Sequence, residues 1–485
     1  MGDSKIRTGN KLIIDIAACA VWSLFVLAVS GCNSALLTPA RIVILITGFI
    51  GFSYLIIRNE NGDKTGRIIA LFTIAAVAVR TFYVLYTGAE QRQHDLGEFD
   101  TDLELNYHAE YIEYLLENHK LLDEDITRHW QFYHPPLQHI LCAVFFGIYR
   151  KIVPGLAHNW DALQTLSLFY SLVTLAVLKS FTGLWNLSPK ARQIAYLTVA
   201  LHPQLIVFSG ALNNDPLSVM FAIAALYLAI VWYNDPKRSF IKLMGISLCV
   251  GLGMMAKLSA GIIAVPVGFI MVKAFFGSKK KLRYFLQYLV FMAVCAPLGL
   301  WYQVRSYILW KVPLTYVAIP DTQLNPGLII GDIPFWKRFL AFGDGINYNI
   351  INETLNEAVF DADYYRDHML LALIGYLLLA SFTVFTVTVA ANLIIVWIKD
   401  RCFTNLVMTI LLAAQLISYV YFCFSYPYTC TMAFRYIVPT IVAASYYTGR
   451  SKDISPNLLS LITTGSAYAF SFISLIFYCL VWIKG

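Results

Sequence analysis

Apolar stretches recur along the chain from near its first residue to its last, and short charged or polar segments separate them. A helix of about 20 such residues crosses the roughly 30 Å of hydrocarbon in a bilayer. The pattern therefore predicts an all-α polytopic membrane protein with about thirteen transmembrane helices. The expected crossings span residues 12–30, 41–57, 67–87, 163–183, 192–210, 215–234, 241–256, 259–276, 284–304, 369–397, 403–425, 434–449 and 457–482.

Composition supports the membrane interpretation. Of the 485 residues, 58% are hydrophobic and 13% are charged, whereas soluble domains average about 45–50% and about 25%. The net charge of +7 comes from Lys and Arg in short clusters between the apolar runs. These residues form no continuous stripe, so the charge does not indicate a nucleic-acid partner. Because short loops rich in Lys and Arg stay cytoplasmic, the clusters instead assign a side to each connection.

One apolar run, residues 135–153, does not fit a simple count of crossings. If it crossed, the basic connections at 190–192 and 237–238 would face outward, against the rule that basic loops stay inside. The run is also short and begins with two prolines. We therefore expect it to lie along the outer interface as an amphipathic helix.

With this topology the outer face receives two long polar segments, loop one (88–134) and a second loop (305–368). It also receives the turns that carry Asp215 and Lys257 and the segment before Arg435. The inner connections are short and basic and contain no glycine-rich nucleotide-binding loop. The sequence therefore places its chemistry at the outer face.

Loop one holds a cluster of acids just after the third expected crossing. Asp95 follows His94 there, and a carboxylate held near the membrane surface can act as a general base toward an acceptor hydroxyl. The alternative is an ordinary surface acid. Tyr107, Tyr111 and Tyr114 follow in helical spacing. This spacing predicts a short helix that either covers the membrane surface or stacks its rings on sugar.

Further short stretches stand out in order along the chain. They are HDLGEF (94–99), HAEYIEY (108–114), WQFYHPPLQH (130–139), NDPL (214–217), GLGMMAKLSAG (251–261) and FRYIVP (434–439). Together they resemble motifs of the GT-C membrane glycosyltransferases, in particular bacterial relatives of the protein O-mannosyltransferases and of the aminoarabinose transferase acting on lipid A. The resemblance covers about residues 67–440, so the first two crossings look like an addition in front of the family's core.

The resemblance implies a GT-C-type helical bundle with an outward-facing cavity and juxtamembrane helices in loop one. It also implies a glycosyltransferase that moves a monosaccharide from a polyprenyl-phosphate donor to an acceptor hydroxyl. Direct displacement of this kind inverts the anomeric centre, because it needs no covalent intermediate. Asp95 matches the family's catalytic aspartate. Many members have Asp-Glu where this chain has Asp95-Leu96, so Asp100 and Asp102 stay as alternative bases.

A divalent metal cation is a further implication, because Asp215 matches a position that helps to bind a metal in some members. Oxygen ligands suit such a cation, and Asp95, Asp215 and His134 are the expected metal ligands. The alternative for Asp215 is a helix cap, since Asp followed by Pro commonly begins a helix. The residues expected beside the substrate or the metal are His94, Glu98, His108, Tyr111, Tyr133, His134 and Asp215.

The departing phosphate of such a donor needs cationic partners at the outer boundary of the membrane. We expect Arg435, Arg305 and Lys257, ranked in that order, to bind it, because all three lie at outer ends of expected crossings. The alternative is that each is an anchor whose charged end reaches the interface.

The expected organisation is an N-terminal two-span hairpin (1–66), a catalytic membrane module (67–304), the second outer loop (305–368) and C-terminal spans (369–485). Its expected partners are the membrane, a lipid-linked sugar donor, and a glycan, lipid or protein acceptor. The expected location is a bacterial plasma membrane with the active site outward, or the ER membrane in a eukaryote. The rival function is a secondary transporter or flippase of a glycan or lipid-linked sugar. Transporters, however, place their sites near the bilayer midplane, whereas the acids here lie in loops.

Overall fold

The computed structural model describes residues 2–60, 63–91, 96, 107–319, 336–340, 349–360 and 368–484, with side chains from Lys11 onward. Within these ranges the chain folds into helices joined by short connections, and the described residues form no β-strand. The prediction of an all-α protein is confirmed.

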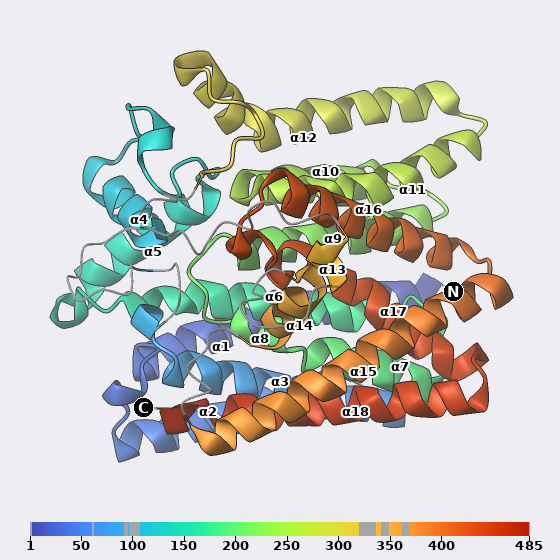
Figure 1. Ribbon diagram of the computed structural model, residues 1–485, viewed down its shortest axis with the longest axis horizontal. Helices are drawn as coiled ribbons and strands as arrows, with labels where there is room; N and C mark the ends of the chain where they lie inside the picture. Colours follow the sequence, from blue (N-terminus) through green and yellow to red (C-terminus); the bar gives the residue numbers. More distant parts are fainter. Residues whose placement is uncertain are drawn as a thin grey trace.

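Ten helical segments of the described chain are long and apolar enough to cross a membrane. The helices in them are α1 (Gly2–Ser30), α2 (Pro39–Asn59), α3 (Lys64–Tyr86), α6 (Gln164–Thr182), α9 (Asp215–Tyr233), α11 (Ala264–Phe276), α12 (Lys281–Trp310), α15 (Met369–Lys399), α16 (Phe403–Ser425) and α18 (Asn457–Cys479). They lie side by side along the long axis of the molecule (Figure 1). Large apolar side chains such as Val43, Leu282 and Ile398 are exposed on them, as expected of helices that face lipid rather than water.

The other helices are shorter. They are α4 (Tyr107–Asn118), α5 (Leu137–Ile152), α7 (Pro189–Ala200), α8 (Pro203–Val207), α10 (Phe240–Ala256), α13 (Lys337–Leu340), α14 (Ile350–Val359) and α17 (Thr440–Ile454). Of the thirteen expected crossings, 241–256 corresponds to the short apolar helix α10. The crossings expected at 192–210 and 434–449 correspond to α7 with α8 and to α17, which are too short to be counted as spans. Helix lengths therefore do not confirm the number thirteen.

The interruption between α7 and α8 falls at a proline. Pro203 has no backbone N–H to continue the hydrogen-bond ladder, and the chain leaves the helix at Ala200 and resumes it one turn later. Arg80 of α3 is fully buried at this point. Its guanidinium donates to the Ala200 carbonyl at 2.7 Å and to Ser171 Oγ at 3.0 Å. The helix is therefore broken at His202-Pro203, and Arg80 is a packing residue of the break.

One end of the molecule carries α4, which belongs to loop one, and α5, which follows this loop (Figure 1). We call it the loop-one end. Helix α5 is not long enough to count as a span, and it turns His139 inward, where the side chain is fully buried. Its opposite face exposes Val144 and Ile148. An apolar outer face on a short helix agrees with a position along the membrane interface.

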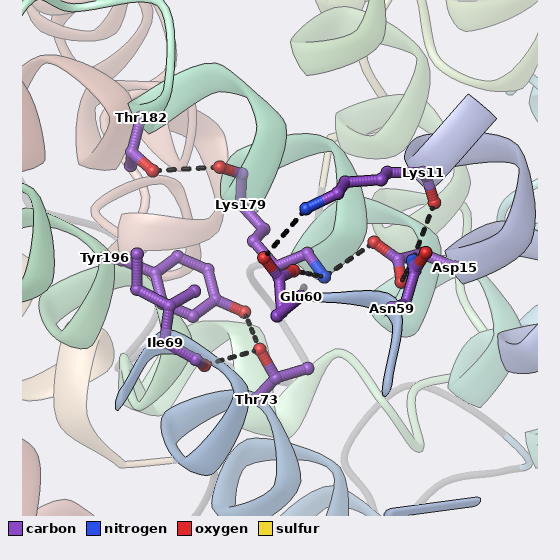
Figure 2. A network of polar contacts seen from close by, with 9 residues as sticks. All are labelled: Lys11, Asp15, Asn59, Glu60, Ile69, Thr73, Lys179, Thr182 and Tyr196. Atoms are coloured by element: carbon purple, nitrogen blue, oxygen red, sulfur yellow. Dashed lines mark hydrogen bonds and ion pairs between the residues drawn. The ribbon is translucent and has the colours of Figure 1, made fainter. Parts of the chain in front are cut away.

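The N-terminal hairpin of α1 and α2 is fixed to the rest of the bundle by buried charges (Figure 2). Lys179 Nζ of α6 lies 2.7 Å from the Asp15 carboxylate of α1 and 2.6 Å from that of Glu60, which follows α2. Lys11 approaches Glu60 at 3.6 Å. This cluster, here called the Lys179 network, joins three chain segments through one ammonium group.

A second connection holds the other end of the hairpin. The Asn33 side-chain amide, between α1 and α2, donates to Asp161 Oδ2 at 2.6 Å. The other oxygen of Asp161 accepts the backbone N–H of Ala89 at 2.7 Å. Since Ala89 lies at the start of loop one, the hairpin contacts the base of this loop through a single carboxylate.

Candidate active site

Five separate parts of the chain surround one cavity of about 330 Å³ at the loop-one end. They are loop one, the start of α9, the turn and 3₁₀ helix that follow α10, the end of α12 with the residues after it, and the end of α16 with the segment that leads to α17. The lining includes the predicted residues His108, Tyr133, His134, Asp215, Lys257 and Arg435. The cavity therefore brings together side chains that the sequence placed on one face from several hundred residues apart.

Asp215 and Lys257 form a buried ion pair in the cavity wall. Lys257 Nζ lies 2.5 Å from Asp215 Oδ1, and the two residues are 8% and 2% exposed. Asn214 occupies the cap position of α9, and Asp215 is the first helical residue. The alternative that Asp215 serves as the helix cap is therefore wrong, since its carboxylate is directed at Lys257.

Arg435 and Lys257 meet at one aromatic ring. The guanidinium of Arg435 lies 5.2 Å from the centre of the Tyr436 ring, and Lys257 Nζ lies 4.9 Å from it. Arg435 Nε is buried without a hydrogen-bond partner among the described residues. The charged groups of the described lining are two cations and one carboxylate, so the wall has a net positive charge and an unsatisfied N–H. Both favour an anionic ligand.

Arg305 lies elsewhere. Helix α12 continues to Trp310, so Arg305 stands within the helix rather than at the start of the second loop as the sequence suggested. Its Nη2 donates to the Leu122 carbonyl at 2.7 Å, and its guanidinium packs over the Trp310 ring at 4.9 Å. Arg305 is not part of the cavity lining. Its position is that of a residue that supports loop one.

Three histidines of loop one and α5 gather beside the cations. His108 Nδ1 and His139 Nε2 are 2.9 Å apart, and the ring of His134 stacks on that of His108 at 6.1 Å. Burial lowers the pKa of His139 to about 3. Burial, followed by the neighbouring histidines and cations, also lowers the pKa of His108 well below its ordinary value; for His134 the order is burial, then Lys257. All three rings are therefore neutral near pH 7.

The tyrosines of α4 form a support beneath the cavity. Tyr111 is fully buried, stacks between Phe132 and His139 at 4.2 Å from each ring, and donates a hydrogen bond to Tyr302. It does not belong to the cavity lining. Of the two interpretations of the tyrosine spacing, the covering helix is the one that Tyr111 fits.

The candidate bases lie outside the described residues. These are Asp95, Asp100 and Asp102, and the neighbouring His94 and Glu98 lie outside them as well. The chain between them is described at Leu96, which is buried in the same apolar cluster as Tyr111 and Phe132. The base prediction accordingly stays a prediction.

Of the three expected metal ligands, Asp215 and His134 lie among the described residues. The Lys257 ammonium already neutralises Asp215, and Asp95 lies outside the described residues. Within the described ranges no three His, Cys, Asp or Glu side chains converge as a metal site. The described side chains do not by themselves fit a divalent cation, and the metal stays a prediction.

Some lining residues were not predicted from the sequence. Tyr436, Gln303 and Ser306 line the cavity, and Gln303 Oε1 is buried without a hydrogen-bond partner among the described residues. Gln303 and Ser306 are three residues apart on α12, which puts them on one helical face. Arg305 points to another face. The spacing of these two polar residues was the signal available in the sequence.

The described helices and this cavity define the chain as an all-helical polytopic membrane protein. No protein-family sequence model and no curated protein sequence matches it. Among solved structures, it is similar to ArnT from Cupriavidus metallidurans, bound to undecaprenyl phosphate, with a TM-score of 0.50 and 13% identity. The similarity covers 87% of this chain and 77% of ArnT. It shows the fold, and it confirms the resemblance on which the predicted bundle rested.

Two other solved structures are similar to smaller degrees. The archaeal oligosaccharyltransferase AglB from Archaeoglobus fulgidus, in complex with an inhibitory peptide and a dolichol-phosphate, has a TM-score of 0.49 and 12% identity over 85% of this chain and 55% of its own. The Saccharomyces cerevisiae protein O-mannosyltransferase Pmt1–Pmt2 complex, bound to the sugar donor, has a TM-score of 0.37 and 13% identity over 56% of this chain. This chain spans 36% of the length of that yeast relative.

Proposed function

We propose that the protein is a glycosyltransferase that moves a monosaccharide from a polyprenyl-phosphate donor to an acceptor hydroxyl on a glycan, a lipid or a protein. The site faces the extracytoplasmic side of the membrane, which is the outside of a bacterial plasma membrane or the lumen of the ER. The observation that carries the proposal is the cavity at the loop-one end, where Lys257 and Arg435 meet among apolar helices.

The charges of the lining support a phosphate ligand. A sugar phosphodiester carries one negative charge, and the described lining has one more cation than carboxylates. Arg435 offers an unpaired Nε, and hydrogen bonds between charged groups contribute about 1.5–3 kcal/mol each. Arg435 binds the donor phosphate directly, while Lys257 is held in place by Asp215.

The apolar side of the cavity supports a lipid-linked donor. Leu258 and Ile262, from the 3₁₀ helix η6 (Leu258–Ile263), and Phe422, from α16, form this part of the wall. Helices α11 and α16 pack side by side next to it. A polyprenyl chain that leaves the cavity between these elements passes from protein into the bilayer without crossing water.

The reaction is a single displacement. The acceptor hydroxyl oxygen attacks the anomeric carbon, and the bond from that carbon to the phosphate oxygen breaks. The electron pair stays on the departing polyprenyl phosphate, and the hydroxyl proton passes to the carboxylate of Asp95, with Asp100 and Asp102 as the alternatives. The anomeric configuration inverts. The positive wall at Arg435 stabilises the negative charge that grows on the phosphate.

The test uses the purified full-length protein in lipid nanodiscs with a panel of radiolabelled polyprenyl-phosphate sugars. We expect the wild type to transfer or hydrolyse one of them, and Asp95→Asn to bind that donor without turning it over. Arg435→Gln should weaken donor binding by roughly 10- to 100-fold, while Arg305→Gln, outside the cavity, should leave it nearly unchanged. If the panel gives neither binding nor turnover and the protein instead moves a glycan or lipid-linked sugar across vesicles, it is a transporter or flippase.

A further inference from the structure

The contact between His108 and His139 allows two positions for the proton that the two rings share. His108 Nδ1 and His139 Nε2 are 2.9 Å apart, so one nitrogen carries the shared proton and the other accepts it. His139 is fully buried and His108 is 4% exposed. His139 Nδ1 is buried without a hydrogen-bond partner among the described residues. A neutral imidazole carries one proton, so the position of the shared proton fixes what every other nitrogen in the pair can do.

The two arrangements of the pair differ in what they leave buried. If His108 donates, the proton of His139 must sit on Nδ1, and a buried N–H has no acceptor. If His139 donates from Nε2, its Nδ1 is a bare acceptor. Buried unpaired N–H groups are rarer in folded proteins than incompletely satisfied acceptors. The second arrangement is therefore favoured, and it leaves the proton of His108 on Nε2.

His108 lines the cavity, whereas His139 does not. The Nδ1 atom of His108 is occupied by His139, so Nε2 is the ring nitrogen available to a ligand. Lys257 and Arg435 line the same cavity as His108. A ligand in this cavity can therefore contact the available N–H together with the two cations.

We propose that His108, held in its Nε2–H form by His139, is a binding residue that donates a hydrogen bond to a phosphate oxygen of the lipid-linked donor. This rests on the proposed function. An uncharged donor adds to the phosphate site without adding a third buried cation beside Lys257 and Arg435. As the glycosyl bond breaks, the phosphate gains negative charge, and a donor already oriented toward it binds it more strongly. His139 is a positioning residue, because it acts only through His108.

The first experiment measures equilibrium binding of polyprenyl phosphate to the full-length protein in nanodiscs. His108→Leu should weaken binding by about 10-fold, as expected for the loss of one hydrogen bond from an uncharged donor to an anionic acceptor. The matched control is His129→Leu. His129 also lies in loop one, but it pairs with Glu110 at 3.1 Å and does not line the cavity. Its replacement should leave the affinity unchanged.

The second experiment separates positioning from simple packing. His139→Gln keeps a side-chain N–H donor, so its affinity should stay near that of the wild type, whereas His139→Leu should fall toward the value of His108→Leu. Solid-state ¹⁵N NMR of histidine-labelled protein, assigned with His108→Leu, should show His108 protonated at Nε2 and bare at Nδ1. Thermal unfolding of each variant confirms that it is folded.

The outcomes are distinct. If His108 is protonated at Nδ1, or if His108→Leu binds as well as the wild type while Arg435→Gln is impaired, this inference is overturned and the proposed function stands. If the wild type binds neither polyprenyl phosphate nor any donor of the panel, both are overturned.

Discussion

The buried pair of Asp215 and Lys257 has a structural role and, under the proposed function, a binding role, and the two roles respond differently to substitution. Removing one member of a buried pair leaves the other charge without compensation, which costs about 3–5 kcal/mol, whereas replacing both is often nearly neutral. We therefore expect Asp215→Asn and Lys257→Met to lower the unfolding temperature, and the double variant to recover most of the loss. Donor binding should stay weak in the double variant. Thermal unfolding and donor titration measure the two effects, and a double variant that recovers both would limit the pair to a structural role.

His139 makes stability depend on pH. Its pKa in the folded protein is about 3, below the ordinary value near 6.5 of an unfolded histidine. Between these values the unfolded chain binds a proton that the folded protein excludes, so stability falls as pH drops from about 6.5 toward 3. His139→Gln removes this titration. Its unfolding temperature should therefore change less over this range than that of the wild type, and equal slopes would contradict the neutral, buried state of the ring.

On α12, the residue predicted for the site differs from the residues that line the cavity. Arg305 was chosen for its charge, yet the cavity receives Gln303 and Ser306. Successive residues of a helix point about 100° apart. The charge of Arg305 therefore did not reveal which face of α12 lines the cavity. Lys257 and Arg435 were predicted correctly as cavity neighbours because each lies at a helix end, where the position along the membrane normal decides the environment.

At the level of elements, the hairpin of α1 and α2 depends on the Lys179 network. Lys179→Met would leave the carboxylates of Asp15 and Glu60 buried without their shared cation. We expect a loss of about 3–5 kcal/mol in the free energy of unfolding. The hairpin contacts the base of loop one through Asn33, at the opposite end of α2 from Glu60. Donor affinity of the folded variant should therefore be unchanged.

A matched variant tests the importance of burial in this prediction. Lys242 pairs with Asp235, but its side chain is 38% exposed. Lys242→Met should therefore cost no more than about 1 kcal/mol. Equal effects of the two lysine substitutions on thermal unfolding would contradict the assignment of the Lys179 network as a buried anchor.

The elements themselves followed from sequence to different degrees. Long apolar runs without proline, such as α15, were predicted almost to the residue. In hydrocarbon, a helix is the simplest structure that satisfies all backbone hydrogen bonds. Helix α7 was predicted too long, and the start of α17 was predicted too early. Proline interrupts the first, and the second begins only after the 3₁₀ turn η10 (Phe434–Ile437) that carries Arg435. Both differences from the prediction occur where the backbone leaves the helix to place polar side chains. The length of an apolar run does not predict such a break.

For the whole molecule, two cysteines allow the proposed orientation in the membrane to be tested. Cys402 precedes α16 and is exposed, whereas Cys430 lies beyond its other end in the cavity lining. A helix of 23 residues separates the two ends by about 35 Å. In intact cells, a membrane-impermeant maleimide should label a variant that retains only Cys430 and should not label one that retains only Cys402. Inverted vesicles should give the opposite result, and the reverse pattern would place the cavity on the cytoplasmic side.

The overall architecture was predictable because it depends on quantities that add along the chain, such as apolar length and the side of each basic cluster. The site depends on contacts between distant segments, and those do not add. The hydrogen bond between His108 and His139 joins two helices, and no periodicity within either helix requires it. The convergence of Lys257 and Arg435 was predicted from topology, whereas their shared contact with Tyr436 and the separate position of Arg305 were not.

Helix α5 has a consequence for how the protein responds to its surroundings. Its outer face is apolar and its inner face carries His139, so the depth at which lipid holds the helix also sets the height of the histidine pair. Bilayer thickness varies between membranes by a few Å, and a mismatch costs fractions of a kcal/mol per Å. We therefore expect the acyl chains around α5 to act on the cavity, so that donor affinity differs between nanodiscs of thin and thick bilayers.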